Sequence, residues 1–71
     1  MQAQLQQKVG ATIRRLRKAQ GYTQDAFADR CGLHRAHMGE IERGEANVTL
    51  QTLKTVSDAL GLKVAELLKG C

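Results

Sequence analysis

The chain has 71 residues, of which 42% are hydrophobic and 25% are charged, and its formal net charge is +4 at pH 7. A chain of this length forms one small domain with a thin core, because it buries only about 60% of the surface that its unfolded form exposes. No window approaches the ~18 to 20 uncharged apolar residues of a membrane span, and no signal peptide opens the sequence. We therefore expect one globular domain over residues 1–71, located in the cytoplasm.

Charge is distributed unevenly along the chain. Residues 1–20 carry five basic and no acidic side chains, residues 21–45 carry a net charge of −2, and residues 46–71 carry one of +1. Together with a pI near 9.5, this asymmetry favours a polyanionic partner, either nucleic acid or an anionic membrane surface. The membrane alternative is disfavoured, because the first predicted helix has a narrow apolar stripe without the Trp or Phe of interfacial helices.

Helical periodicity and glycines divide the first half of the chain into two predicted helices. The first runs from about Leu5 to Gln20, with one apolar stripe formed by Leu5, Val9, Ile13 and Leu16. Gly21 suits a left-handed cap at its C-terminal end. The second helix runs from about Gln24 to Cys31 after Thr23 as N-cap, and its expected buried residues are Phe27, Ala28 and Cys31.

Three further helices are predicted in the second half. One covers about His34 to Arg43, with Met38 and Ile41 facing inward. After a loop over residues 44–47, Thr49 is expected to cap a fourth helix, whose apolar set is Leu50, Leu53, Val56 and Leu60. A last short helix covers about residues 63–69. The absence of proline agrees with this pattern, which predicts an all-α domain of five short helices.

Residues 23–43 form a unit of two short helices joined by a turn of about three residues that contains a glycine. Such helix-turn-helix units place their second helix in the major groove of DNA. The outward arc of that helix is predicted to hold Arg35, Ala36, Gly39, Glu40 and Arg43. A mid-helix glycine costs about 1 kcal/mol relative to alanine. Gly39 therefore indicates either close docking against DNA or chance tolerance, and both interpretations stay open.

Several short motifs agree in order and spacing with one known family: Ile13-Arg14-x-Leu16-Arg17, Gly21-x-Thr23-Gln24, Phe27-Ala28, Gly32-Leu33 and Ile41-Glu42-Arg43-Gly44. Through them the chain resembles, over about residues 9–68, the Cro/C1-type (XRE) helix-turn-helix family of phage repressors and bacterial regulators. Within that family, the run HRAHMGEIERGEANVT is similar to small restriction–modification controller proteins. The resemblance implies a five-helix, lambda-repressor-like DNA-binding domain in a bacterial or phage-encoded transcriptional regulator that associates with the nucleoid through DNA.

The resemblance also implies contacts with double-stranded DNA. The side chains expected to face base edges are His34, Arg35, Ala36 and Glu40. There Arg35 can pair with guanine O6 and N7, Ala36 can contact a thymine methyl, and Glu40 can accept a hydrogen bond from cytosine N4. The family often has Ser, Thr or Asp in place of His34, which leaves the role of that histidine open. The residues expected at phosphates are Gln24, His37, Arg43 and Asn47.

Arg17 and Glu42 are expected to be structural. On a helical wheel each lies about 40° from a buried residue of its own helix. The resemblance pairs them as an ion pair that joins the first helix to the recognition helix. Loss of one partner would leave a partly buried charge, at a cost of up to ~3 to 5 kcal/mol.

A second copy of the chain is an expected partner, because one recognition helix reads only a few base pairs. Two-fold pairing would place two recognition helices about 34 Å apart on a partly palindromic operator. The region expected to form the homodimer covers about residues 49–69, through Leu62, Val64, Leu67 and Leu68. The alternative is that these four residues close the core of the monomer.

Other functional classes compete with a DNA-binding regulator. The first is a DNA-binding antitoxin or interaction module whose main partner is another protein. A metal site is superficially suggested by Cys31, His34 and His37, but a fourth ligand is missing and Cys31 occupies an apolar helix face. No carboxylate pair, Ser/His/Asp set or phosphate loop predicts an enzyme, and no cofactor or small-molecule ligand is implied. The operator and the sign of regulation do not follow from the sequence.

Overall fold

Five α-helices make up the part of the chain that the computed structural model describes, residues 2–69, and no strand occurs in that part. The helices are α1 (Gln2–Ala19), α2 (Gln24–Cys31), α3 (Arg35–Arg43), α4 (Leu50–Leu60) and α5 (Val64–Leu67). The predicted all-α class and the order of the elements are thereby confirmed. The largest differences from the predicted bounds are in the first and last helices, since α1 begins three residues earlier and α5 is only four residues long.

Local capping explains where the helices begin and end. The hydroxyl oxygen of Thr23 accepts a hydrogen bond from the backbone N–H of Ala26, and that of Thr49 accepts one from Thr52, each at 3.1 Å. Both threonines therefore satisfy donors that a helix start leaves without an intrahelical acceptor. At the end of α3, Gly44 adopts φ +75°, a left-handed conformation that an L side chain rarely takes.

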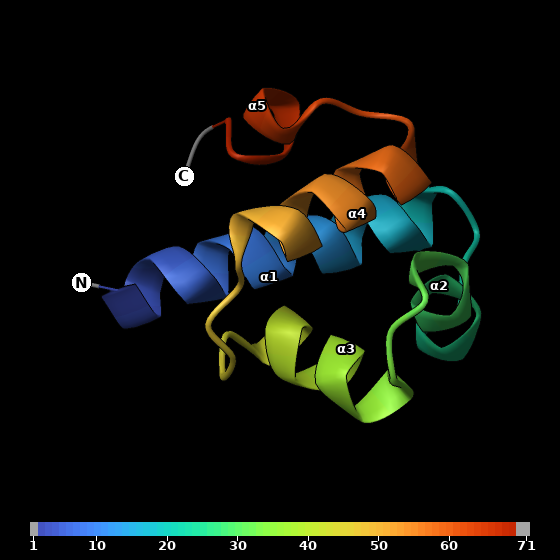
Figure 1. The fold of residues 1–71 in the computed structure, drawn as a ribbon, viewed down its shortest axis with the longest axis horizontal. Helices are drawn as coiled ribbons and strands as arrows, with labels where there is room; N and C mark the ends of the chain where they lie inside the picture. Colours follow the sequence, from blue (N-terminus) through green and yellow to red (C-terminus); the bar gives the residue numbers. More distant parts are fainter. Residues whose placement is uncertain (1, 70–71) are drawn as a thin grey trace.

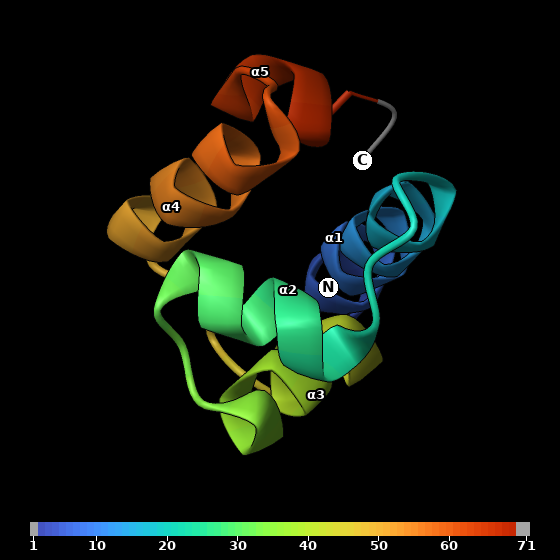
Figure 2. The same ribbon diagram turned by 90° about the vertical axis from the view of Figure 1, so that its right-hand side faces the viewer.

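The core lies between α1 and the other four helices (Figures 1 and 2). α1 contacts α3, α4 and α5, while α2 contacts α3 and α4. Apolar side chains from all five helices form one buried cluster: Val9, Ile13, Phe27, Ala28, Cys31, Met38, Ile41, Leu53, Val56, Leu60 and Leu67. One shared cluster explains how so short a chain holds five short helices together, because none of them could bury its apolar face alone.

Three apolar residues lie elsewhere than their sequence pattern predicts. Leu5 and Leu50, expected to face inward, are 49% and 79% exposed. Both lie in the first turns of their helices, at the edge of the core. Leu67 shows the opposite correction: it has no exposed surface and belongs to the core, so it offers no side chain to a second copy. The other three residues of the predicted dimer region, Leu62, Val64 and Leu68, are half-buried against the core.

Gly10 sets how closely α1 approaches α3. A Cβ atom at this position would lie 2.3 Å from the carbonyl oxygen of Ile41 and 2.6 Å from that of Glu42. Backbone atoms cannot yield to such contacts, so only a residue without a side chain permits this crossing. This role was not predicted from the sequence, although a glycine inside a helix of otherwise good helix formers is itself a signal of a packing constraint.

Candidate nucleic-acid interface

α2 and α3 form the predicted helix-turn-helix, with a turn of three residues between them (Figure 2). The turn begins at Gly32, whose φ is +70°, and ends at His34, the N-cap of α3. Unlike Thr23 and Thr49, His34 makes no capping hydrogen bond with its side chain. The exposed imidazole at the start of α3 is therefore left available for another contact.

The exposed face of α3 is narrower than its sequence predicts. Met38 and Ile41 are buried as expected, and the exposed residues of the helix include Arg35, Ala36 and Glu40. Gly39 is buried, and placing it on the outward arc was wrong. A Cβ atom there would lie 3.0 Å from Nη1 of Arg43 and 3.5 Å from Oε1 of Gln24. The glycine thus makes room for two neighbouring side chains of the protein.

A buried ion pair attaches α3 to α1. Nε of Arg17 lies 2.7 Å from Oε2 of Glu42, and Nη2 of Arg17 donates to Oε1 of Glu42 at 2.8 Å. The two side chains are only 6% and 3% exposed. The hydrogen bonds to Glu42 raise the pKa of Arg17, and they outweigh the opposing effect of burial. The structure thus places Arg17 and Glu42 as the resemblance implies.

The same pair also engages the start of α2. The Nη1 atom of Arg17 donates to the carbonyl oxygen of Tyr22 at 3.0 Å, and the amide of Gln24 donates to Oε1 of Glu42 at 3.2 Å. The pair is therefore well supplied with hydrogen bonds, which is the condition under which a buried ion pair is tolerated. The result is a rigid junction of three helices beneath the exposed face of α3.

An exposed ion pair links α2 to the first residue of α3. Nη1 of Arg35 donates to Oδ2 of Asp25 at 3.1 Å, and the two side chains are 71% and 63% exposed. The sequence pattern gave no indication of this contact. Periodicity could not have revealed it, because the two residues lie on different helices, on either side of the turn.

Two further side-chain contacts on this face join close sequence neighbours. Nη2 of Arg43 lies 3.0 Å from Oε1 of Glu45, and Nδ1 of His37 lies 3.5 Å from Oε1 of Glu40. The hydrogen bond with Glu45 raises the pKa of Arg43, and the same bond lowers the pKa of the Glu45 carboxyl. All four side chains are solvent-accessible, so both pairs can exchange partners with water or with a ligand.

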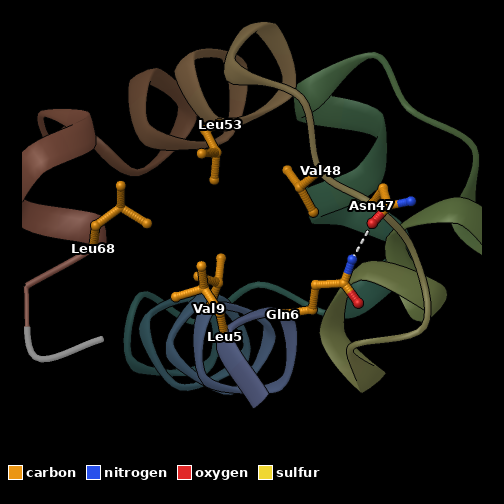
Figure 3. Close-up of a pocket in the computed structure, with 7 residues that line it drawn as sticks. All are labelled: Leu5, Gln6, Val9, Asn47, Val48, Leu53 and Leu68. Atoms are coloured by element: carbon orange, nitrogen blue, oxygen red, sulfur yellow. Dashed lines mark hydrogen bonds between the residues drawn. The ribbon is translucent and has the colours of Figure 1, made fainter. Parts of the chain in front are cut away.

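The side-chain amides of two of the expected phosphate ligands form hydrogen bonds with other side chains of the protein. Gln24 bonds Glu42, as described above, and Asn47 accepts a hydrogen bond from the amide of Gln6 on α1 (Figure 3). Asn47 lies beside an apolar groove of about 340 Å³ between α1, α4 and α5, which is lined by Leu5, Gln6, Val9, Asn47, Val48, Leu53 and Leu68. The sequence pattern placed Asn47 correctly in a loop but contained no sign of its partner.

The three residues that superficially suggested a metal site lie in different settings. Cys31 is buried in the core, where burial raises the pKa of its thiol, whereas His34 is exposed at the turn. Across residues 2–69, no three His, Cys, Asp or Glu side chains come together in a group that could hold a metal ion. None of the helices in the same range is both long enough and apolar enough to cross a membrane.

Comparison with known proteins places this geometry among helix-turn-helix proteins. Residues 13–67 match the family model described as helix-turn-helix. The control protein C.BamHI of Bacillus amyloliquefaciens is 37% identical over 60 residues, which cover 83% of this chain and 74% of that protein. The crystal structure of the restriction–modification controller protein C.AhdI from Aeromonas hydrophila superposes with a TM-score of 0.84 at 37% identity, covering 87% of this chain and 94% of that one.

A second similar structure contains DNA. It is the crystal structure of SinR, the master regulator for biofilm formation, in complex with DNA. This chain superposes on it with a TM-score of 0.80 at 32% identity, over 86% of this chain and 98% of that one. The likeness therefore covers nearly the whole of both chains.

Proposed function

This chain belongs to the Cro/C1-type (XRE) helix-turn-helix family of DNA-binding transcriptional regulators, and we propose that it binds a partly palindromic operator as a homodimer with α3 in the major groove. The observation that carries this proposal is the exposed face of α3, held in place by the buried pair of Arg17 and Glu42. Such rigidity is needed because a base contact works only if the side chain arrives in the right register. The likeness to control proteins supports a regulator of that kind.

Base readout in this proposal belongs to the exposed face of α3 and its N-cap. Arg35 pairs with guanine O6 and N7, Ala36 packs against a thymine methyl, and Glu40 accepts from cytosine N4. His34 reaches a base edge from the N-cap position, where its imidazole makes no capping bond. Ala36 supports a close approach, because its short side chain lets the helix backbone move deep into the groove.

The proposed phosphate contacts surround the reading face, which consists of His34, Arg35, Ala36 and Glu40. Arg43 and His37 reach the backbone from α3, where each lies beside a carboxylate whose place water or phosphate can take. Gln24 lies in the first turn of α2, where helix N–H groups favour anions. Because its amide bonds Glu42, its backbone N–H is the group proposed to bind a phosphate. Asn47 offers its amide N–H groups, since its side-chain oxygen is the atom bonded to Gln6.

The homodimer surface is proposed on α5 and the turn before it. Leu62, Val64 and Leu68 are half-buried, so each keeps apolar surface that a second copy could cover. Leu68 also borders the apolar groove beside α1. Removing this surface from water would add to the small core of a short chain.

Binding experiments with selected DNA test the readout. An operator is first obtained by selection from random duplexes, and affinities for it and for a scrambled duplex are measured by fluorescence anisotropy. Arg35→Ala should cost about 1 to 3 kcal/mol on the operator and relax the preference at one base pair. Arg43→Ala serves as the matched control, since loss of a phosphate contact weakens binding to both duplexes about equally. Equal losses on both duplexes for Arg35→Ala would contradict the readout role.

Salt dependence tests the phosphate contacts. A dimer with about 6 to 10 such contacts should lose roughly 10³- to 10⁵-fold in affinity between about 50 and 200 mM salt. Arg43→Ala should make the slope of log Kd against log salt concentration shallower. A response that does not vary with salt would rule out the phosphate contacts.

Sedimentation tests the homodimer. Val64→Glu should give a folded monomer with much weaker operator binding, because a charge on an apolar interface cannot be paired. Ala11→Glu is the control, since it makes the same charge change at an exposed position of α1. Leu67→Glu is unsuitable, because it would unfold the core. A Val64→Glu protein that remains dimeric would disprove this interface.

A further inference from the structure

Asp25 is a charged residue of the helix-turn-helix to which the proposed function gives no role. It lies in the first turn of α2, and its carboxylate bonds the guanidinium of Arg35, the first residue of α3. The pair spans the turn of the motif and joins two helices. It is also highly exposed, and exposed pairs add little to the stability of a fold. The pair itself therefore contributes little to stability, and the position of the carboxylate in the first turn of α2 adds about 0.3 to 1 kcal/mol.

Its effect on charge is at first sight unfavourable for DNA binding. A carboxylate beside the reading face repels the phosphates of a duplex, whatever the base sequence. Replacing Asp25 with a neutral residue should thus strengthen binding to every DNA, if repulsion were its only effect. The geometry of the contact with Arg35 gives the carboxylate a second effect.

That geometry leaves most of the guanidinium free. Arginine carries five N–H donors in a planar fork, and Asp25 takes one of them, on Nη1. The edge formed by Nε and Nη2 makes no other hydrogen bond within the described residues. A guanine needs two donors, for O6 and N7. Arg35 can consequently bond Asp25 and a guanine at the same time.

Holding Arg35 in one orientation has a direct consequence for readout. An exposed arginine samples many rotamers and loses this freedom when it binds a base. The bond to Asp25 already restricts the rotamers of Arg35, so less conformational entropy is lost when the arginine binds a base. This gain applies only when Arg35 can bond Asp25 and a guanine at the same time. The restraint favours the correct base pair and gives no help to a base pair that lacks the two acceptors.

We propose that Asp25 is a positioning residue that orients Arg35 toward guanine and thereby determines specificity at one base pair of the operator. The proposal deepens the function proposed above and rests on it. It differs from simple repulsion in one measurable quantity, the ratio of affinities for the operator and for a duplex changed at that base pair. Repulsion alone leaves this ratio unchanged, whereas positioning makes it fall when Asp25 is replaced.

The test uses the full chain with Asp25→Asn, which removes the charge and keeps the size of the side chain. The base pair read by Arg35 is first identified as the position at which Arg35→Ala no longer discriminates. Dissociation constants are then measured for the operator, for the operator changed at that pair, and for a scrambled duplex. Loss of the whole guanine contact corresponds to roughly 5- to 140-fold in discrimination. Asp25→Asn should lose part of it, roughly 3- to 10-fold, and bind the scrambled duplex more tightly.

Two controls isolate the positioning effect. Asp58→Asn removes the same charge from another exposed pair, in which Oδ1 of Asp58 lies 2.8 Å from Nζ of Lys54 on α4. It should leave the ratio unchanged. In the double variant Arg35→Ala/Asp25→Asn, the second substitution should have no further effect on discrimination, because Asp25 acts only through Arg35. Circular dichroism verifies that each variant is folded.

The outcomes separate this proposal from the one on which it rests. A ratio that stays constant in Asp25→Asn, while Arg35→Ala loses discrimination, overturns the positioning role and leaves the readout by Arg35 intact. The positioning role is equally overturned if Asp25→Asn lowers discrimination to the same extent in the absence of Arg35. If Arg35→Ala itself keeps full discrimination, the proposed readout fails and the positioning role fails with it. A fall in the ratio that requires Arg35 supports both.

Discussion

Two arginine–carboxylate pairs attach α3 to its neighbours, and they differ in almost every physical property. The pair of Arg17 and Glu42 is buried, makes two hydrogen bonds of 2.7 and 2.8 Å, and contacts further groups at the start of α2. The pair of Arg35 and Asp25 is exposed and makes one bond of 3.1 Å. The same kind of ion pair therefore stabilises the fold when it is buried and, in our proposal, orients a DNA-reading arginine when it is exposed.

The difference arises from access to water. In the core, no solvent can replace a lost partner, so the remaining charge keeps its full desolvation cost. On the surface, water or a phosphate takes the place of the partner, and little free energy is lost. A buried pair can thus fix the direction of a helix, and an exposed pair can exchange or share its arginine with a ligand.

The largest effect is expected when the buried pair is broken. Glu42→Ala leaves the charge of Arg17 uncompensated in the interior and should lower the free energy of unfolding by about 3 to 5 kcal/mol. Urea unfolding monitored by circular dichroism measures the loss. Glu40→Ala is the matched control, because it makes the same substitution on an exposed face of the same helix, where changes stay within about 0.5 kcal/mol. Similar losses in the free energy of unfolding for the two variants would show that the buried pair is no more important for stability than an exposed side chain.

The second-largest effect is expected at Gly10, where α1 and α3 approach each other closely enough to form the buried pair of Arg17 and Glu42. Gly10→Ala should destabilise the domain by about 1 to 3 kcal/mol, because the added Cβ meets backbone carbonyls of α3. The sign itself is the test. Helix propensity alone predicts that this substitution stabilises α1 by about 1 kcal/mol, so a gain in thermal stability would show that α1 and α3 are farther apart.

A smaller effect is expected for the exposed pair. Asp25→Asn should change the free energy of unfolding by less than about 1 kcal/mol, and this change should shrink in high salt. Asp58→Asn, in a pair of similar exposure, should behave in the same way. A loss comparable to that of Glu42→Ala would mean that Asp25 supports the fold, and the contrast between the two pairs would disappear.

The smallest effect depends on pH and tests the exposed pair at the end of α3. Arg43 holds the pKa of Glu45 below its ordinary value of 4.5 in the folded protein. The folded state thus binds protons less readily than the unfolded state, so the stabilisation is complete above about pH 5 and is lost as the pH falls through the folded pKa. Wild type should therefore exceed Glu45→Gln slightly in stability at neutral pH, and the two should converge in acid. A difference that grows toward low pH contradicts this pairing.

Sequence alone determined those features of the molecule that depend on near neighbours. Thr23 and Thr49 were predicted as N-caps, since a cap needs only its own hydroxyl and the next turn of helix. The inward faces of α2 and α3 followed from periodicity, because residues three and four apart share a side of a helix. The exposed residues of the reading face followed from the same arithmetic, with Gly39 as the exception.

Tertiary structure decided everything that depends on where another helix lies. Leu50 and Leu67 both fit an apolar pattern, yet one is exposed and the other buried, because coverage depends on the neighbouring elements. The role of Gly10 and the bond between Arg35 and Asp25 exist only once two helices cross at a particular distance. Periodicity describes one helix at a time, and it contains no information about the distance to the next.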